Sequence, residues 1–314
     1  RQMCIRDRSW VTDFSAIIGN KIAWFKRLGV SIKRMVHLLQ GTRAEKLVEY
    51  TPVYLRGELP DVPFTPKEDH HQLDTLDVHN LTYLFPDTGR GIEGVEMHLQ
   101  RGSFTVITGR VGSGKTTLLQ ALLGLLPAQS GEIYWNGIPV QDPGEFFVPP
   151  RSAYTPQVPL LFSESLKENI LMGLPESLVN IESAISTSVL EQDLEEIPKG
   201  LSAVVGAKGV KLSGGQRQRI AAARMFAREP SLFVFDDISS ALDVETERKL
   251  WKRIFENQRD ATCLVVSHRK PALQRADQII LLKEGRIEAV GKLEELLHSN
   301  GEMQKLWHGD LDDN

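Results

Sequence analysis

The stretch Thr108–Thr117, TGRVGSGKTT, constrains the fold of this chain more than any other part of the sequence. It fits the pattern G-x-x-x-x-G-K-[ST] of a phosphate-binding loop, with Gly109, Gly114, Lys115 and Thr116 at the defining positions. An apolar run typical of a strand precedes the loop, and a leucine-rich run typical of a helix follows it. Strand, loop and helix in this order direct backbone N–H groups and the positive end of the helix toward an anion. The sequence therefore predicts an α/β fold that binds a nucleotide at this loop.

Each residue of the loop has a predicted role. Lys115 is expected to reach the β- and γ-phosphates, and the Thr116 hydroxyl is expected to hold Mg²⁺. The other residues are expected to bind phosphate mainly through backbone N–H groups: Gly109, Arg110, Val111, Gly112, Ser113, Gly114 and Thr117. A glycine-rich turn without a ligand is the alternative, but the flanking strand and helix favour a nucleotide site.

Composition excludes some other classes of protein. The formal net charge of −4 argues against a broad nucleic-acid-binding surface, so we expect no nucleic-acid partner. The chain contains two cysteines, which predicts no disulfide framework. Cys263 lies in an apolar run and is expected to be a small buried hydrophobic residue. No apolar stretch reaches the roughly 18–20 residues that cross a bilayer.

The first 72 residues differ in character from the rest. The chain does not begin with Met, and we expect it to be a fragment of a longer protein. Residues 14–39 have helical periodicity, which we expect Gly19 and Gly29 to interrupt. This segment is either an amphipathic helix packed on the following domain or the cytoplasmic end of a membrane helix. Residues 51–71 contain four prolines and predict an extended linker, which gives two domains, 1–72 and 73–314.

A second set of candidate residues follows two apolar strands. Residues 232–235 predict a buried parallel strand, and Asp236 and Asp237 lie at its carboxyl end, where open α/β sheets bind ligands. Asp236 is suited to hold Mg²⁺ and its water, and Asp237 to polarise the attacking water. Residues 264–266 predict another strand, and His268 after it is a candidate contact for the γ-phosphate.

Ser213 lies just before an alanine-rich helix. Ser213 is expected to cap this helix, and the following Gly214 and Gly215 allow a ligand to approach its end. A plain capped turn is the alternative. Upstream, residues 163–196 predict a separate helical subdomain.

The remaining segments predict strands, turns and a terminal helix. Residues 73–85 and 95–99 are expected to form strands of a small antiparallel layer, and residues 131–137 are expected to form a strand closed by an Asn-Gly turn. Residues 278–290 predict a hairpin, and residues 293–307 predict one terminal helix.

Taken together, these motifs make residues 73–297 resemble the nucleotide-binding domain of ABC transporters. The resemblance implies a P-loop NTPase core with an antiparallel β-subdomain and an inserted α-helical subdomain. It also implies that ATP and Mg²⁺ are bound and that two such domains pair head to tail. The resemblance assigns residues 109–117 to the Walker A loop and Asp236 to Walker B. It makes Gln157 the Q-loop residue, both a catalytic residue and a Mg²⁺ ligand, and makes Asp237 and His268 further catalytic residues. It assigns Ser213, Gly214, Gly215 and Gln216 to the signature, Asp243 to the D-loop, and Phe85, with Tyr83 as the alternative, to stacking on adenine.

Residues 161–170 and 31–39 resemble the exporter branch of the family. The resemblance implies an ATPase domain that powers transport at the cytoplasmic face of the cell membrane, with a membrane-spanning permease domain as a second partner. Two features depart from the family pattern. Asp237 stands where the family usually has Glu, and residues 206–209 lack the Glu usual before the signature.

These departures favour a heterodimer in which this chain's own ATP site is slow. Two alternatives stay open: a degenerate half that clamps ATP and regulates its partner, and a soluble ABC ATPase.

Overall fold

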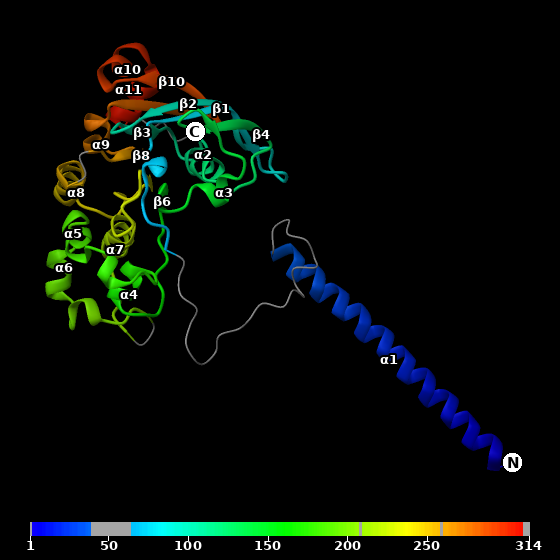
Figure 1. Ribbon diagram of the computed structural model, residues 1–314. Coiled ribbons are helices and arrows are strands. Elements are labelled where there is room, and N and C mark those ends of the chain that lie inside the picture. The colour runs from blue at the N-terminus through cyan, green and yellow to red at the C-terminus, as the bar shows by residue number, and fades with distance from the viewer. Residues whose placement is uncertain (1, 39–63, 207–208, 258–259, 310–314) are drawn as a thin grey trace. The chain divides into compact units, whose positions relative to one another are not determined.

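The computed structural model describes residues 2–38, 64–206, 209–257 and 260–309 (Figure 1). The chain divides into two compact units, Arg1–Pro60 and Asp61–Asn314. Most of the expected linker, and Ala207 and Lys208 before the signature, lie outside the described residues. The last residues before the expected boundary at position 72 belong to the second unit, where Lys67 Nζ donates to the carbonyl of Glu229 at 3.0 Å. The assignment of residues 1–72 to a membrane-domain remnant stays a prediction.

The described part of the first unit is one helix, α1 (Gln2–Leu38). The expected interruption at Gly19 and Gly29 is wrong, since the helix continues through both. Each glycine costs a helix only about 1 kcal/mol, which the neighbouring residues offset. The large apolar side chains described on α1, among them Trp10 and Phe25, are exposed. Among the described residues, no helix combines the length and the apolar character needed to cross a membrane.

A six-stranded sheet in the order β10-β9-β3-β8-β7-β6 forms the centre of the second unit. All neighbouring strands are parallel except the β9–β10 hairpin, which confirms the hairpin expected at residues 278–290. Every residue of the three central strands is buried, as expected for parallel strands covered on both faces. The strands are β3 (Phe104–Thr108), β6 (Ser152–Thr155), β7 (Leu232–Asp236), β8 (Thr262–Val266), β9 (Gln278–Lys283) and β10 (Arg286–Gly291).

Two hydrophobic cores lie on opposite faces of this sheet. Alternate residues of β7 separate between them: Phe233 and Phe235 join one core, and Leu232 and Val234 join the other. The first core includes residues of α7 (Gly214–Phe226), α8 (Val244–Asn257), α9 (Lys270–Arg275), α10 (Leu293–Ser299) and α11 (Gly301–His308). The second core includes residues of α2 (Lys115–Leu122) and of the antiparallel sheet. The predicted α/β class is confirmed.

The expectation of one terminal helix over residues 293–307 is wrong, because α10 and α11 are separated at Asn300. The backbone of Asn300 is extended, and its side-chain Oδ1 accepts from the N–H of Met303 at 2.9 Å. Asn300 thus ends one helix and caps the next.

A second, antiparallel sheet has the order β2-β1-β4-β5 and confirms the expected β-layer. Its strands are β1 (Thr75–Leu84), β2 (Gly91–Gln100), β4 (Ser130–Trp135) and β5 (Ile138–Pro139). Asn136 and Gly137 both have positive φ, 53° and 75°, the signature of a type I′ turn. The Asn136 side chain also accepts from the N–H groups of Asp74 and Thr75, which fastens the start of β1.

Short helices fill the segment between β6 and α7, which confirms the helical subdomain. They are α4 (Leu166–Leu171), α5 (Ile181–Thr187) and α6 (Glu191–Glu196), with 3₁₀ turns η3 (Glu176–Leu178) and η4 (Gly200–Ser202); α3 (Pro143–Phe146) precedes β6, and η2 (Asp69–His71) precedes β1. A bidentate ion pair joins this subdomain to α7: Arg219 donates to both Asp193 oxygens at 2.7 Å. This ion pair therefore joins the signature helix α7 directly to the helical subdomain.

Candidate functional site

The phosphate loop (residues 109–117) connects β3 to α2 at the carboxyl end of the sheet. Gly109, Gly112 and Gly114 all have positive φ. A Cβ atom at Gly109 would lie 2.1 Å from the carbonyl oxygen of Leu282 on β9, so no other residue fits there. Val111 at the tip is fully exposed. The backbone of the loop thus has the geometry that the sequence pattern predicted.

Lys115 folds back over this loop. Its Nζ donates to the carbonyls of Gly109 and Arg110 at 2.9 and 2.7 Å. Burial lowers the pKa of Lys115, and the charges of Asp236 and Asp237 oppose that shift. The two carboxylates therefore lie near enough to Lys115 to support its charge.

Asp236, at the end of β7, is held by two hydroxyl groups. Thr116 donates to Asp236 Oδ1 at 3.1 Å, and the Tyr154 hydroxyl donates to Oδ2 at 3.3 Å. Burial raises the pKa of Asp236, and the hydrogen bonds from Thr116 and Tyr154 oppose this shift. Tyr154 was not among the predicted site residues. Its contact with Asp236 depends on the pairing of β6 with β7, which no local sequence signal specifies.

The residue types at this place suit magnesium. Thr116, Asp236 and Gln157 offer a hydroxyl, a carboxylate and an amide oxygen, and Mg²⁺ prefers oxygen ligands. Among the described residues no group of three or more His, Cys, Asp or Glu side chains could hold a metal. Protein-bound Mg²⁺ usually takes one or two carboxylates and completes its shell with phosphate and water.

Asp236 and Asp237 begin a tight turn, residues 236–242, that we name the carboxylate turn. The φ of Asp237, 51°, is the left-handed conformation that non-glycine residues rarely adopt, and such strain is common at functional sites. Gln157 Nε2 donates to Asp237 Oδ2 at 3.2 Å, and the buried Oδ1 has no hydrogen-bond partner within the described part of the chain. Burial raises the pKa of Asp237, and the neighbouring His268 opposes this. The structure thus brings Gln157, Asp237 and His268 together.

His268 follows β8, as predicted, and its side chain is exposed. The side chain of the next residue, Arg269, binds the carboxylate turn. It donates to the carbonyl of Leu242 at 2.6 Å and to that of Ser239, and lies 3.3 Å from Glu247 Oε2. Sequence reasoning did not identify Arg269 or Glu247, whose contact depends on the tertiary fold.

The signature residues form the first turn of α7. Ser213 Oγ accepts from Gln216 N at 3.1 Å, and Gln216 Oε1 accepts from Ser213 N at 2.9 Å, which is a complete capping box. The predicted N-cap is therefore confirmed. A Cβ atom at Gly215 would lie 2.8 Å from the carbonyl oxygen of Ala241, so this glycine lets the helix pack against the carboxylate turn.

Asp243 and Phe85 lie at the margins of this arrangement. The Asp243 carboxylate caps α8: it accepts from the hydroxyl and N–H of Thr246 and the N–H of Glu245, and these bonds lower its pKa to about 2. Phe85 is partly exposed after β1 and makes an edge contact with Tyr83. Among the described residues, no hydrogen bond or ion pair joins the phosphate loop to Asp243 or to the signature residues. Their nucleotide contacts stay predictions.

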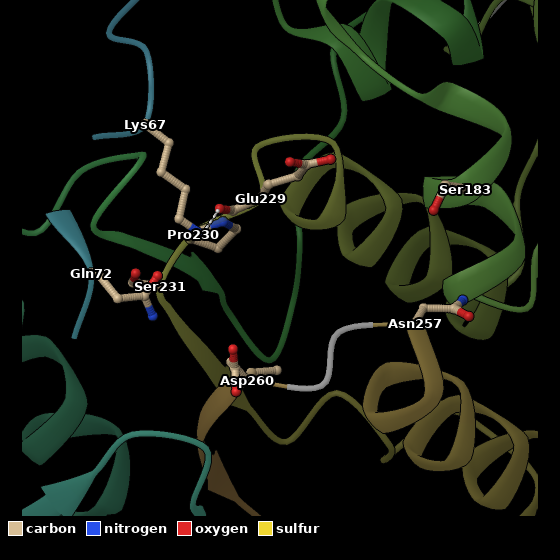
Figure 2. Close-up of a pocket in the computed structure, with 9 residues that line it drawn as sticks. Lys67, Gln72, Ser183, Glu229, Pro230, Ser231, Asn257 and Asp260 are labelled. Carbon is tan, nitrogen blue, oxygen red and sulfur yellow. Dashed lines mark hydrogen bonds between the residues drawn. The ribbon is translucent and has the colours of Figure 1, made fainter. Parts of the chain in front are cut away.

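Two of the cavities in the described part of the chain bear on how this arrangement could be used. A polar cavity of about 330 Å³ lies at the amino ends of β7 and β8, opposite to the phosphate loop; Figure 2 shows Lys67 and Glu229 beside it. An apolar groove of about 770 Å³ lies beside β6 and α7, and its exposed lining includes Val158, Leu160 and Phe162 just after Gln157. The groove is thus continuous in sequence with the site, whereas the polar cavity is not.

Comparison with known proteins agrees with this geometry. A sequence model of the ABC transporter family matches residues 92–240. A probable multidrug resistance ABC transporter ATP-binding/permease protein of Bacillus subtilis is 37% identical over 224 residues, or 71% of this chain and 38% of that protein. An ATP-dependent lipid A-core flippase of Alkalilimnicola ehrlichii is 32% identical over 258 residues, or 79% of this chain and 44% of that protein. The solved structure of a bacterial Atm1-family ABC exporter with ATP bound has a TM-score of 0.69 and 25% identity, covering 80% of this chain and 44% of that one.

Fold, loop and paired carboxylates define the class as a P-loop nucleotide-binding protein. The chain belongs to the ABC transporter family and contains a nucleotide-binding domain of the exporter type. It spans less than half the length of the two curated relatives. Domains of this family bind ATP, generally with Mg²⁺, and the oxygen donors described above fit that ion.

Proposed function

We propose that this chain is the ATP-hydrolysing motor of a membrane exporter, working as one half of a head-to-tail dimer at the cytoplasmic face of the cell membrane. The observation that carries the proposal is the meeting of the phosphate loop with the paired carboxylates. Thr116 Oγ1 lies 3.1 Å from Asp236 Oδ1, and Asp237 follows with a buried oxygen that has no partner among the described residues. That arrangement provides a phosphate cradle, an ion site and a base in one place.

The mechanism assigns a step to each side chain. Phosphate oxygens would take the place of the carbonyls of Gly109 and Arg110 at the ammonium of Lys115. Thr116, Asp236 and Gln157 would hold Mg²⁺, which neutralises phosphate charge when bound. Asp237 Oδ1, free of hydrogen bonds in the described chain, would accept the proton of the attacking water, and His268 would contact the γ-phosphate.

The apolar groove supports a membrane-domain partner. Val158, Leu160 and Phe162 expose apolar side chains directly after Gln157, and exposed apolar surface of this kind marks protein contacts. A permease segment in this groove would move the backbone of Gln157, whose amide bonds to Asp237. Through this hydrogen bond between Gln157 and Asp237, a movement of the permease segment would change the position of the catalytic carboxylate and so couple transport to hydrolysis.

The dimer completes the site with the signature residues of a second domain. The capping box occupies the N–H groups of Ser213 and Gln216, and those of Gly214 and Gly215 at the start of α7 would bind a phosphate from the partner domain. Phe85 would stack on adenine, and Asp243 would lie at the dimer contact. Because Asp237 replaces Glu, we favour a heterodimer in which this chain's signature serves the faster site.

The second candidate function is an ATP clamp that regulates a partner. It is favoured by one observation, the short side chain at position 237. The Asp side chain is one methylene shorter than Glu, about 1.5 Å, and such a displacement of a catalytic group can cost on the order of 10²-fold in rate. Under this function ATP binds tightly and hydrolysis is slow.

One experiment tests both functions. Steady-state hydrolysis is measured for the chain and for Asp237→Glu and Asp237→Asn, and ATP affinity is measured separately by displacement of a fluorescent ATP analogue. A motor loses about 10²-fold in hydrolysis with Asp237→Asn. A clamp binds ATP, barely turns over, and gains at least about 10-fold with Asp237→Glu.

Asp260→Asn is the matched control, because Asp260 lies at the amino end of β8 beside the polar cavity. Hydrolysis that responds to neither change at position 237 contradicts both functions.

A further inference from the structure

Gln218 lies on α7, two residues after the signature motif, and its side chain is almost completely buried. A buried amide must find hydrogen-bond partners, since leaving one unpaired costs about 1–3 kcal/mol. Among the described residues, the hydrogen-bond partners of the Gln218 side chain lie in two segments of the site, the Q-loop at Gln157 and the carboxylate turn.

The amide oxygen and the amide nitrogen of Gln218 bind different atoms of these segments. Oε1 accepts from the backbone N–H of Ala241 at 3.2 Å. Nε2 donates to Ser240 Oγ at 2.9 Å, and it also lies 3.3 Å from the Gln157 carbonyl and 3.4 Å from the Asp237 carbonyl. Two hydrogens are thus shared among three acceptors.

A hydrogen-bond relay connects Gln218 to the strained residue. Ser240 Oγ accepts from Gln218 and donates to the carbonyl of Asp237 at 3.0 Å. On the other side, the N–H of Asp237 donates to the carbonyl of Val266 on β8. Both the N–H and the carbonyl of the left-handed residue Asp237 are therefore hydrogen-bonded, and Gln218 contributes to the bonds of the carbonyl.

The contact with Gln157 fixes the second partner of the same carboxylate. Gln218 binds the backbone carbonyl of Gln157, whose side-chain amide reaches Asp237 Oδ2 at 3.2 Å. Gln218 contacts neither the phosphate loop nor Asp236 directly among its described hydrogen bonds. It is placed to affect the position of the base but not the binding of the phosphates.

We propose that Gln218 is a positioning residue for hydrolysis: it holds the Asp237 carboxylate and the Gln157 amide in register from the signature helix. The inference rests on the proposed function. One consequence is that a displacement of α7 by a partner at the signature would be transmitted to this chain's own base through the Gln218 side chain.

The test uses Gln218→Met, which keeps the length and volume of the side chain and removes its hydrogen bonds. In the nucleotide-free chain, amide hydrogen exchange of Asp237 and Ala241 should rise by at least about 10-fold, with that of Ser113 and Leu118 unchanged. With Mg-ATP, kcat should fall by about 10-fold or more while the ATP Kd changes less than about twofold.

Two further variants keep the proposal falsifiable. Ser240→Ala removes the relay hydroxyl without altering α7 and should change exchange at Asp237 and kcat in the same direction, less strongly. Gln192→Met, an exposed glutamine on α6, is the matched control and should change neither.

Several results would overturn the inference. Unchanged exchange at Asp237 and Ala241 in both Gln218→Met and Ser240→Ala would do so. Faster exchange throughout the domain, with kcat and Kd affected alike, would show a general packing role instead. An inactive wild-type chain would favour the clamp over the motor, and the exchange measurements would still decide the role of Gln218.

Discussion

The phosphate loop and the carboxylate turn lie at the same end of the sheet but are held in different ways. The loop is held mainly through its own backbone groups: the Lys115 ammonium binds two loop carbonyls, Ser113 N donates to Arg110 O at 3.2 Å, and Gly285 N donates to Ser113 O at 3.0 Å. The turn is held by side chains from elsewhere. Gln218 reaches it from α7, and Arg269 reaches it from the end of β8.

The difference lies in where each conformation is encoded. Glycines at positive φ allow the loop to bend, and these glycines belong to the loop itself. The turn contains Asp237 in a conformation that costs of order 1–3 kcal/mol, and the cost is offset by partners far away in sequence. The turn should therefore respond to distant substitutions, and the loop should not.

The largest effect is expected from Arg269→Ala. Arg269 binds the carbonyls of Ser239 and Leu242 and lies 3.3 Å from Glu247, whose side chain is fully buried. Removing one partner of a buried ion pair leaves an uncompensated charge, so we expect a loss of about 3 kcal/mol in the free energy of unfolding. Urea unfolding of the domain measures it.

Arg248→Ala is the matched control, because Arg248 is an exposed arginine on α8 and should cost less than about 0.5 kcal/mol. Adding Glu247→Gln to Arg269→Ala should recover part of the loss. If Arg269→Ala behaves like the control, the turn does not depend on that distant side chain.

A smaller effect of opposite sign is expected from Asp237→Asn. Burial raises the pKa of Asp237 above its unfolded value, so the native state binds more protons between those two values. Stability therefore falls as pH rises through this window, and the deficit is complete above the folded pKa. Asn carries no charge, so Asp237→Asn should stabilise the nucleotide-free chain by about 1 kcal/mol at neutral pH.

The pH dependence separates this cause from others. The gain in the free energy of unfolding should shrink toward zero as the pH falls below about 4, where Asp237 is protonated in both states. A gain that stays constant with pH would point to relief of backbone strain, since Asn adopts positive φ readily. No gain at all would mean that the turn stores no cost at this residue.

Locally encoded features were predicted from the sequence. The phosphate loop, the buried strands, the Ser213 cap and the Asn136-Gly137 turn each depend on residues within a few positions of one another. The terminal helix was mispredicted although a local signal was present. Apolar periodicity over residues 293–307 hid the Asn300-Gly301 pair that divides it.

Features that depend on distant partners could not be predicted in this way. Tyr154, Gln218 and Arg269 are ordinary residues in a strand, in a helix and after a strand. Their roles follow from which strands become neighbours, β6 beside β7 and β8 beside β7. Strand order in a parallel sheet is set by crossover connections, which short motifs do not specify.

The smallest effect is expected at the ion pair that joins the phosphate loop to a distant helix, α11, and this pair gives the sharpest test of the comparison between loop and turn. Arg110 donates from Nε and Nη2 to the two oxygens of Glu302 at the start of α11, which lowers the pKa of Glu302. Stability from this pair is present at neutral pH and is lost as pH falls through the lowered pKa. Because the Arg110 side chain is 41% exposed, solvent screens the pair, and Glu302→Gln should lower the free energy of unfolding by at most about 1 kcal/mol.

ATP affinity, measured by analogue displacement, should change less than about twofold in Glu302→Gln, as in the exposed control Glu294→Gln on α10. A tenfold loss of affinity would mean that the loop, like the turn, needs a distant side chain, and the distinction between the two would fail.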